Sequence, residues 1–161
     1  ASGASSPAAE ARADHDTDTD DQEVQADLAY TYTSGGNLRC AVFGRKDSTT
    51  TRDYYQFGMQ RDSGVDVYRI LERNAGAPTT LADSAGVTAT SATIKLIVDG
   101  TSIAGYVGGV LTVGPVTDAT ISGNTRAGLA YVGGSGDSCT ADNFRVADAT
   151  ARSRGGSRWL P

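Results

Sequence analysis

The sequence predicts an all-β domain, a sandwich of two antiparallel sheets with about ten strands and no significant helix. Two features carry this prediction. Apolar and polar residues alternate with a period of two along much of the chain, and Gly, which supplies 20 of the 161 residues, marks turns at short intervals. A chain of this length suffices for one domain with a buried core.

The first half of the chain contains strand patterns at residues 23–33, 38–46, 53–61 and 65–73. In the first of these, every second residue is apolar and is expected on one buried face: Val24, Ala26, Leu28, Tyr30 and Tyr32. In the third, Tyr55, Phe57 and Met59 share a face that we expect to point into the core. The tripeptide at residues 62–64, Asp-Ser-Gly, supplies the turn of a hairpin.

The second half begins with residues 74–91, which are polar and include Pro78, so we expect a loop with at most a short strand near residues 79–81. The strongest strand pattern covers residues 93–98 and ends at Asp99 and Gly100, a pair that suits a tight turn with positive φ. Further strands are expected at residues 102–107, 110–113, 125–132 and 140–146. The chain therefore divides into an N-terminal edge strand or linker with an acidic turn (1–21), a sandwich (22–147) and a tail that leaves the domain (148–161).

Composition excludes several classes of protein. A net charge of −5 and a pI near 4.7 argue against a nucleic-acid partner, which needs a basic surface. The single histidine, His15, argues against His-based metal clusters and a Ser-His-Asp triad. No apolar run reaches the roughly 18 residues of a membrane helix, so no membrane partner is expected. The chain starts without Met or a leader, from which we expect a processed or excised chain.

Two cysteines, Cys40 and Cys139, allow one intramolecular disulfide, which would stabilise the fold because the loop that it closes is long. The alternative is a pair of buried free thiols. The spacing alone leaves both alternatives open.

Several short motifs in the second half occur in a familiar order. They are Ile94–Gly100 (I-K-L-I-V-D-G), 103–111 (I-A-G-Y-V-G-G-V-L), 127–130 (A-G-L-A) and 141–146 (A-D-N-F-R-V), after a Tyr54-Tyr55 pair. Together they resemble the concanavalin A-like lectin/glucanase (laminin G-like) jelly-roll superfamily over residues 22–147. The opening D-x-F strand and Gly-Trp pair of that superfamily are missing here. The resemblance implies a jelly roll with a concave face, in a superfamily dominated by sugar binding and often appended to secreted bacterial enzymes or phage virion and tail proteins.

The chain lacks the carboxylates of the glucanase branch of this superfamily, which uses an E-x-D-x-(x)-E strand. Glu23 and Asp27 stand four positions apart without a third carboxylate in phase. We therefore expect no enzymatic activity.

An acidic run at residues 14–21 places carboxylates at alternate positions, a spacing that suits Ca²⁺. Asp16, Asp18 and Asp20 are the candidate ligands, and calcium is common among laminin G-like relatives. However, an EF-hand loop would need Gly where Thr19 stands and a bidentate Glu where Gln25 stands. The alternative is a solvated turn, and no other cofactor is expected.

Sugar sites combine a flat aromatic ring with planar polar groups, and several residues offer that chemistry. The candidates for one carbohydrate-binding face are Arg52, Tyr54, Gln56, Tyr68 and Tyr106. The alternative is that these tyrosines are ordinary sandwich aromatics whose hydroxyls reach water.

The tail contains Arg152, Arg154, Arg158 and the only Trp, Trp159. Because Trp and Arg are favoured anchors at interfaces, we expect a segment that docks to a partner chain, and the alternative is a disordered terminus. The resemblance implies, together with a composition of 12 Arg to 2 Lys that is typical of GC-rich genes and the absent start Met, a non-catalytic extracellular or virion module of an actinobacterial phage. It would serve in attachment, decoration or binding of cell-surface polysaccharide, anchored to neighbouring virion or parent-protein chains and able to form a homo-oligomer. The alternatives are an accessory carbohydrate-binding module of a secreted bacterial hydrolase and a purely structural virion protein without a sugar site.

Overall fold

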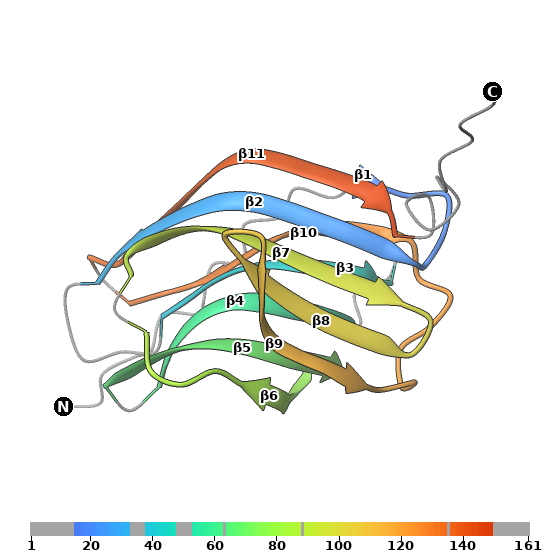
Figure 1. Ribbon diagram of the computed structural model, residues 1–161, viewed down its shortest axis with the longest axis horizontal. Coiled ribbons are helices and arrows are strands. Elements are labelled where there is room, and N and C mark those ends of the chain that lie inside the picture. Colours follow the sequence, from blue (N-terminus) through green and yellow to red (C-terminus); the bar gives the residue numbers. More distant parts are fainter. Residues whose placement is uncertain are drawn as a thin grey trace, which may run out of the picture.

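Two antiparallel sheets pack face to face in the computed structural model, which describes residues 15–32, 38–47, 53–62, 64–87, 89–134 and 136–149 (Figure 1). The six-stranded sheet has the order β1 (His15–Asp16), β10 (Arg126–Val132), β3 (Arg39–Lys46), β4 (Tyr54–Asp62), β5 (Val65–Asn74) and β6 (Ala77–Asp83). The five-stranded sheet has the order β11 (Ser138–Asp148), β2 (Gln22–Thr31), β7 (Ser91–Asp99), β8 (Ser102–Val107) and β9 (Val110–Thr117).

The predicted all-β sandwich is confirmed, and the described residues contain no helix. This part of the chain therefore holds no membrane-spanning helix. The loop predicted after residue 74 is wrong in part, because seven of its residues form the edge strand β6. Pro78 is compatible with β6 since only one side of an edge strand pairs with a neighbour.

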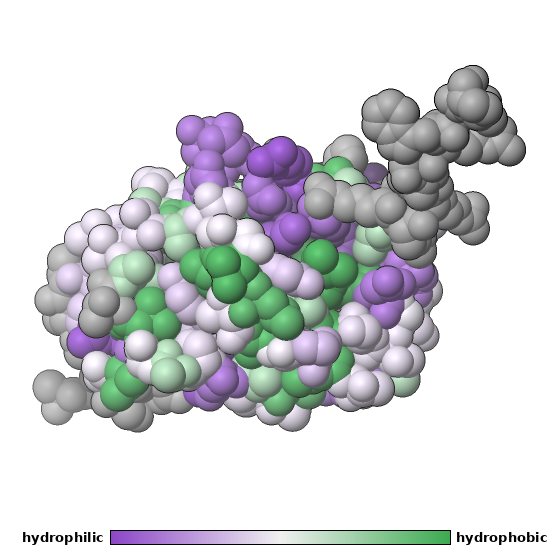
Figure 2. All heavy atoms as spheres, in the orientation of Figure 1, coloured by the Kyte–Doolittle hydropathy of each residue, from purple (hydrophilic) through white to green (hydrophobic). Residues whose placement is uncertain are grey.

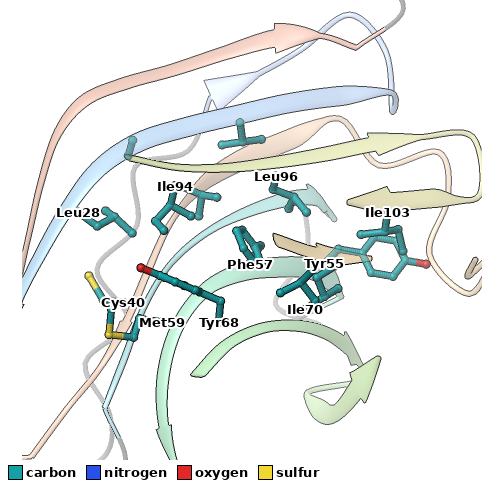
Figure 3. Packing of buried hydrophobic residues seen from close by; sticks show 14 of the residues in the cluster. Leu28, Cys40, Tyr55, Phe57, Met59, Tyr68, Ile70, Ile94, Leu96 and Ile103 are labelled. Atoms are coloured by element: carbon teal, nitrogen blue, oxygen red, sulfur yellow. The ribbon is translucent and has the colours of Figure 1, made fainter. Parts of the chain in front are cut away.

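The core lies between the sheets and uses the faces that the alternation predicts. β2 contributes Val24, Ala26 and Leu28, each at most 5% exposed. The aromatic centre comes from β4, where Tyr55 and Phe57 point toward Ile94, Leu96 and Ile103 of the opposite sheet (Figure 3). A Cβ atom on Gly105 would lie 2.3 Å from the Phe57 ring, so β8 requires glycine where it crosses that ring.

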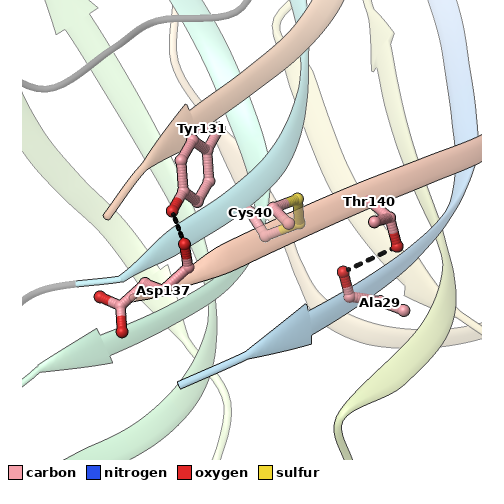
Figure 4. Close-up of a disulfide and its surroundings, with 6 residues drawn as sticks. Ala29, Cys40, Tyr131, Asp137 and Thr140 are labelled. Carbon is pink, nitrogen blue, oxygen red and sulfur yellow. Dashed lines mark hydrogen bonds between the residues drawn. A yellow bond between two sulfur atoms is a disulfide. The ribbon is translucent and has the colours of Figure 1, made fainter. Parts of the chain in front are cut away.

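A disulfide connects the two layers. Cys40 of β3 and Cys139 of β11 are bonded, with their Cα atoms 5.9 Å apart (Figure 4). Both cysteines are therefore in the bond, and the alternative of two free thiols is wrong. Beside the bridge, the Tyr131 hydroxyl donates to the carbonyl of Asp137 at 2.8 Å and Thr140 donates to that of Ala29 at 3.3 Å. The bridge thus joins the edge strand β11 to an inner strand of the other sheet.

Candidate functional site

The outer face of the five-stranded sheet contains an open depression of about 570 Å³. Because Ile94, Leu96 and Val98 of β7 point into the core, the alternate residues Lys95 and Ile97 point outward. The register places Tyr106 of β8 beside Lys95, and Leu111 of β9 beside Tyr106. We call this surface the Tyr106 face, defined by Glu23, Lys95, Ile97, Asp99, Ser102, Tyr106 and Leu111.

The charged groups of the Tyr106 face are held next to its aromatic ring. The Lys95 ammonium lies 5.0 Å from the centroid of the Tyr106 ring and 3.7 Å from Oε2 of Glu23. The Lys95 and Glu23 side chains are 16% and 9% exposed, so both are partly shielded from water. Because water screens them less, the attraction of the Lys95 ammonium to the Glu23 carboxylate and to the Tyr106 ring is stronger than it would be in full solvent.

Apolar side chains are exposed along the same surface. Val110 is 68% exposed and Leu111 45% exposed, both at the start of β9. Figure 2 shows hydrophobic residues gathered over the β8–β9 turn, with polar residues around them. An aromatic ring with apolar neighbours and a polar rim can hold a ligand that has one apolar face and hydroxyls at its edges.

A second depression of about 620 Å³ lies on the same sheet, across β11, β2 and β7. Asp27 is its central polar group: it accepts hydrogen bonds from the Thr93 hydroxyl and, at 2.7 Å, from Nδ2 of Asn143. The bond from Thr93, followed by that from Asn143, lowers the pKa of the Asp27 carboxyl below its ordinary value. Asp27 is thus an ionised acceptor, and Asp142 stands opposite it in the β2–β11 register.

The structure does not bring the predicted sugar-binding residues together. Tyr54 and Gln56 lie on the outer face of the six-stranded sheet, where they are 2% and 4% exposed. Tyr68 is 5% exposed and lies in the core, because its register partner on β4 is the core residue Met59. Tyr106 belongs to the other sheet, and Arg52 lies outside the described residues. The prediction of one shared face is therefore wrong.

The buried outer face of the six-stranded sheet contains its own small cluster. The Phe43 and Tyr54 rings lie 5.2 Å apart, and the Arg73 guanidinium lies 5.9 Å from the Tyr54 ring. Gln60, 5% exposed, has an Oε1 atom without a hydrogen-bond partner. Since a stacking ring must be accessible, the burial of Tyr54 leaves Tyr106 as the ring of the predicted set that can contact a sugar.

Two of the three carboxylates predicted to bind calcium are engaged by other partners. Asp16 pairs with Arg126 at 3.1 Å, and Asp20 accepts from the Gly123 amide at 2.8 Å. Among the described residues, no group of three acidic, His or Cys side chains could hold a metal ion. The ligand set Asp16, Asp18 and Asp20 is therefore not assembled, because each of the two paired carboxylates is directed to a different element.

A second cation beside the acidic run, Arg45, is buried, with its side chain 3% exposed. Its guanidinium donates to the Asp20 carbonyl at 2.7 Å, to Oδ1 of Asp21 at 3.0 Å and to the Ile121 carbonyl at 3.2 Å. Sequence reasoning missed this residue, because nothing in the chain near Arg45 indicates that β3 ends beside the acidic run. The predicted docking residues Arg152, Arg154, Arg158 and Trp159 lie outside the described residues.

The arrangement of the two sheets defines the structural class of the chain, a jelly-roll β-sandwich of the concanavalin and galectin type. No protein-family model and no curated protein matches the chain. Among solved structures, the carbohydrate binding module CBM66 from Bacillus subtilis is similar with a TM-score of 0.62 at 16% identity, covering 83% of this chain and 76% of that one.

Two further structures share the fold. A mutant of the GH43 protein BlXynB from Bacillus licheniformis gives a TM-score of 0.60 at 17% identity, covering 80% of this chain but 28% of that chain. Sheep Galectin-11 gives 0.57 at 12% identity, covering 89% of this chain and 100% of that one. At these identities the likeness establishes the sandwich fold, while the laminin G-like part of the sequence resemblance stays a prediction.

Proposed function

We propose that this chain is a non-catalytic carbohydrate-binding module and that it binds sugar on the Tyr106 face. The observation that carries the proposal is the position of Tyr106, an accessible ring between the Lys95–Glu23 pair and exposed Leu111. The names of two similar structures, a carbohydrate binding module and a galectin, support the same class of ligand.

The binding mechanism is passive. The apolar face of a sugar ring lies on Tyr106 and Leu111, while its hydroxyls exchange hydrogen bonds with Lys95 and Glu23 at the rim. Because the ion pair is already formed in the free protein, little side-chain order has to be gained on binding.

One property of the Asp27 carboxyl supports a binding rather than a hydrolytic role for the second depression. A glycosidase needs one carboxyl with a raised pKa to protonate the leaving group. The pKa of Asp27 is instead lowered by its hydrogen bonds with Thr93 and Asn143.

The setting that the comparisons favour is an accessory module. The sandwich matches 28% of the BlXynB chain, so this fold occurs there as one part of a larger protein. A module of a secreted bacterial hydrolase is therefore our preferred setting, and attachment of a phage virion to cell-surface polysaccharide is the second. In either setting, several copies would raise the avidity of a weak site.

The test is binding of the full chain to a panel of soluble polysaccharides, measured by calorimetry for wild type, Tyr106→Ala and Tyr32→Ala. Tyr32 is a matched control, since it is also a partly buried tyrosine with a cation over its ring, Arg61 at 3.8 Å. We expect Tyr106→Ala to weaken binding about tenfold and Tyr32→Ala to leave it within about twofold. Equal binding by wild type and Tyr106→Ala, or no binding to any polysaccharide, would exclude the proposal.

A further inference from the structure

We infer that the ligand is an internal stretch of a neutral polysaccharide, bound along β2 and β7 from the Tyr106 face to a second subsite at Asp27. This inference rests on the proposed function and names its substrate class. It depends on how the two depressions of the five-stranded sheet are arranged relative to each other.

The two depressions follow each other along the same strands. Lys95 lines the first and Thr93 the second, and both point outward from β7. On β2 the outward residues that line them are Glu23 and Asp27, paired with Ile97 and Thr93, and Gln25, the partner of Lys95, stands between the two. The two steps from Thr93 to Lys95 span roughly 6.6 Å and the four steps from Asp27 to Glu23 roughly 13 Å, so the subsites are neighbours on one sheet surface. A ligand that fills both must be elongated and must run along the strands.

The second subsite offers hydroxyl chemistry in place of stacking. Thr93, Thr140 and Ser91 line it together with the carboxylates Asp27 and Asp142, and its lining includes no aromatic residue. Ionised carboxylates accept hydrogen bonds only, whereas the hydroxyls both donate and accept. The alternating donors and acceptors of a polysaccharide chain match this set, which would hold a sugar unit by its edges.

The charge of the outer face excludes one class of polysaccharide. Four carboxylates line the two depressions, and Lys95 is the cation that lines them. Among the described residues a second cation, exposed Arg145, stands opposite Gln25 in the β2–β11 register and its charge acts on Asp27, so the four carboxylates still outnumber the two cations. An acidic polysaccharide would be repelled by this surface, whereas a neutral one would not.

The experiment uses a neutral polymer that binds in the panel above, together with its dimer, tetramer and hexamer, and polygalacturonate as the acidic probe. For wild type we expect affinity to rise from dimer to hexamer and polygalacturonate to bind at least about tenfold more weakly than the neutral polymer. We expect Thr93→Val and Asp27→Asn to weaken hexamer binding about tenfold and to leave dimer binding unchanged. Tyr106→Ala should weaken both.

The control is Thr79→Val, an exposed β-strand substitution on the other sheet, which should change neither affinity. Thermal unfolding of every variant separates lost binding from lost structure. Three outcomes would overturn the extended neutral subsite while leaving the proposed function intact. They are equal affinity for oligomers of all lengths, tight binding of polygalacturonate, and normal hexamer binding by both Asp27→Asn and Thr93→Val. Absence of binding to every polymer would instead overturn both.

Discussion

Tyr55 donates a hydrogen bond from its phenol to Oδ1 of Asp118 and accepts one from the Ile121 amide at 3.1 Å. The ring belongs to β4 and is fully buried, whereas Asp118 and Ile121 belong to the segment that follows β9. One hydroxyl therefore fixes the segment between the sheets to the core.

Substitution of Tyr55 by Phe tests this connection. Removing the hydroxyl leaves the buried Ile121 amide without its acceptor, and we expect the free energy of unfolding to fall by about 1–3 kcal/mol. Burial alone would raise the pKa of the Asp118 carboxyl, but the bonds from Tyr55 and Thr120 outweigh burial and lower it. The stabilisation by Asp118 is thus present above its unfolded pKa and lost as pH falls through the lower folded value. Urea denaturation between neutral and acidic pH should show a weaker acid loss for Tyr55→Phe.

The raised pKa of Tyr30 predicts that the protein loses stability at alkaline pH. Burial, followed by the nearby Asp66 charge, raises its pKa to about 12, and its hydroxyl donates to the Ala89 carbonyl. A raised folded pKa means that the stabilisation is complete below the unfolded pKa near 10 and disappears as pH rises toward 12. The free energy of unfolding should therefore decline across this window, and Tyr30→Phe should flatten the decline. An unchanged slope in Tyr30→Phe would contradict the assignment.

We expect the buried ion pair of Arg45 to contribute much more to the free energy of unfolding than an exposed ion pair does. Replacing Arg45 with Met leaves the Asp20 and Ile121 carbonyls without the guanidinium, and it leaves the Asp21 carboxylate without its charge partner although the Gly100 amide still donates to Oδ1, at a cost of about 3 kcal/mol. The matched variant is Arg126→Met, whose partner Asp16 is 72% exposed, and for which we expect less than about 1 kcal/mol. Chemical denaturation measures both. Similar losses in the two variants would show that Arg45 does not anchor the acidic run.

The disulfide predicts that substituting both of its cysteines lowers the free energy of unfolding. A Cys40→Ser and Cys139→Ser double variant should unfold with a free energy about 2–4 kcal/mol lower than wild type, because a long loop in the unfolded chain is then released. Reducing agent should destabilise wild type by a similar amount and leave the double variant unaffected. An identical response of both proteins to reductant would indicate that the bridge contributes nothing.

Alternation predicted the strands and their buried faces because burial has the period of the β-strand itself. It placed Tyr55, Phe57 and Met59 in the core without reference to any partner strand. The edge strand β6 was predicted only as a short strand near residues 79–81, because an Ala-Pro-Thr-Thr sequence has little apolar alternation and its pairing is supplied by β5.

The sequence predicted the residue types of the candidate site but not which of those residues lie on one surface. Alternation shows which residues of one strand share a face, yet only the strand order decides which strands share a sheet. Tyr54 and Tyr106 consequently fall on opposite layers of the sandwich, and Tyr68 turns inward with its partner Met59. Asp27 and Thr93 lie far apart in sequence, so their contact depends on the β2–β7 register, which no local pattern specifies.

The bridge at Cys139 also determines how the sandwich would respond to a pulling force. A force on the chain beyond β11 would first peel this edge strand from β2, breaking the ladder from Asp148 back to Thr140. At Cys139 the peeling would stop, because the load then passes through a covalent bond to Cys40 in the opposite layer. Both layers would resist further extension together, so a module tethered through this strand would retain the Tyr106 face on β7 and β8 under tension.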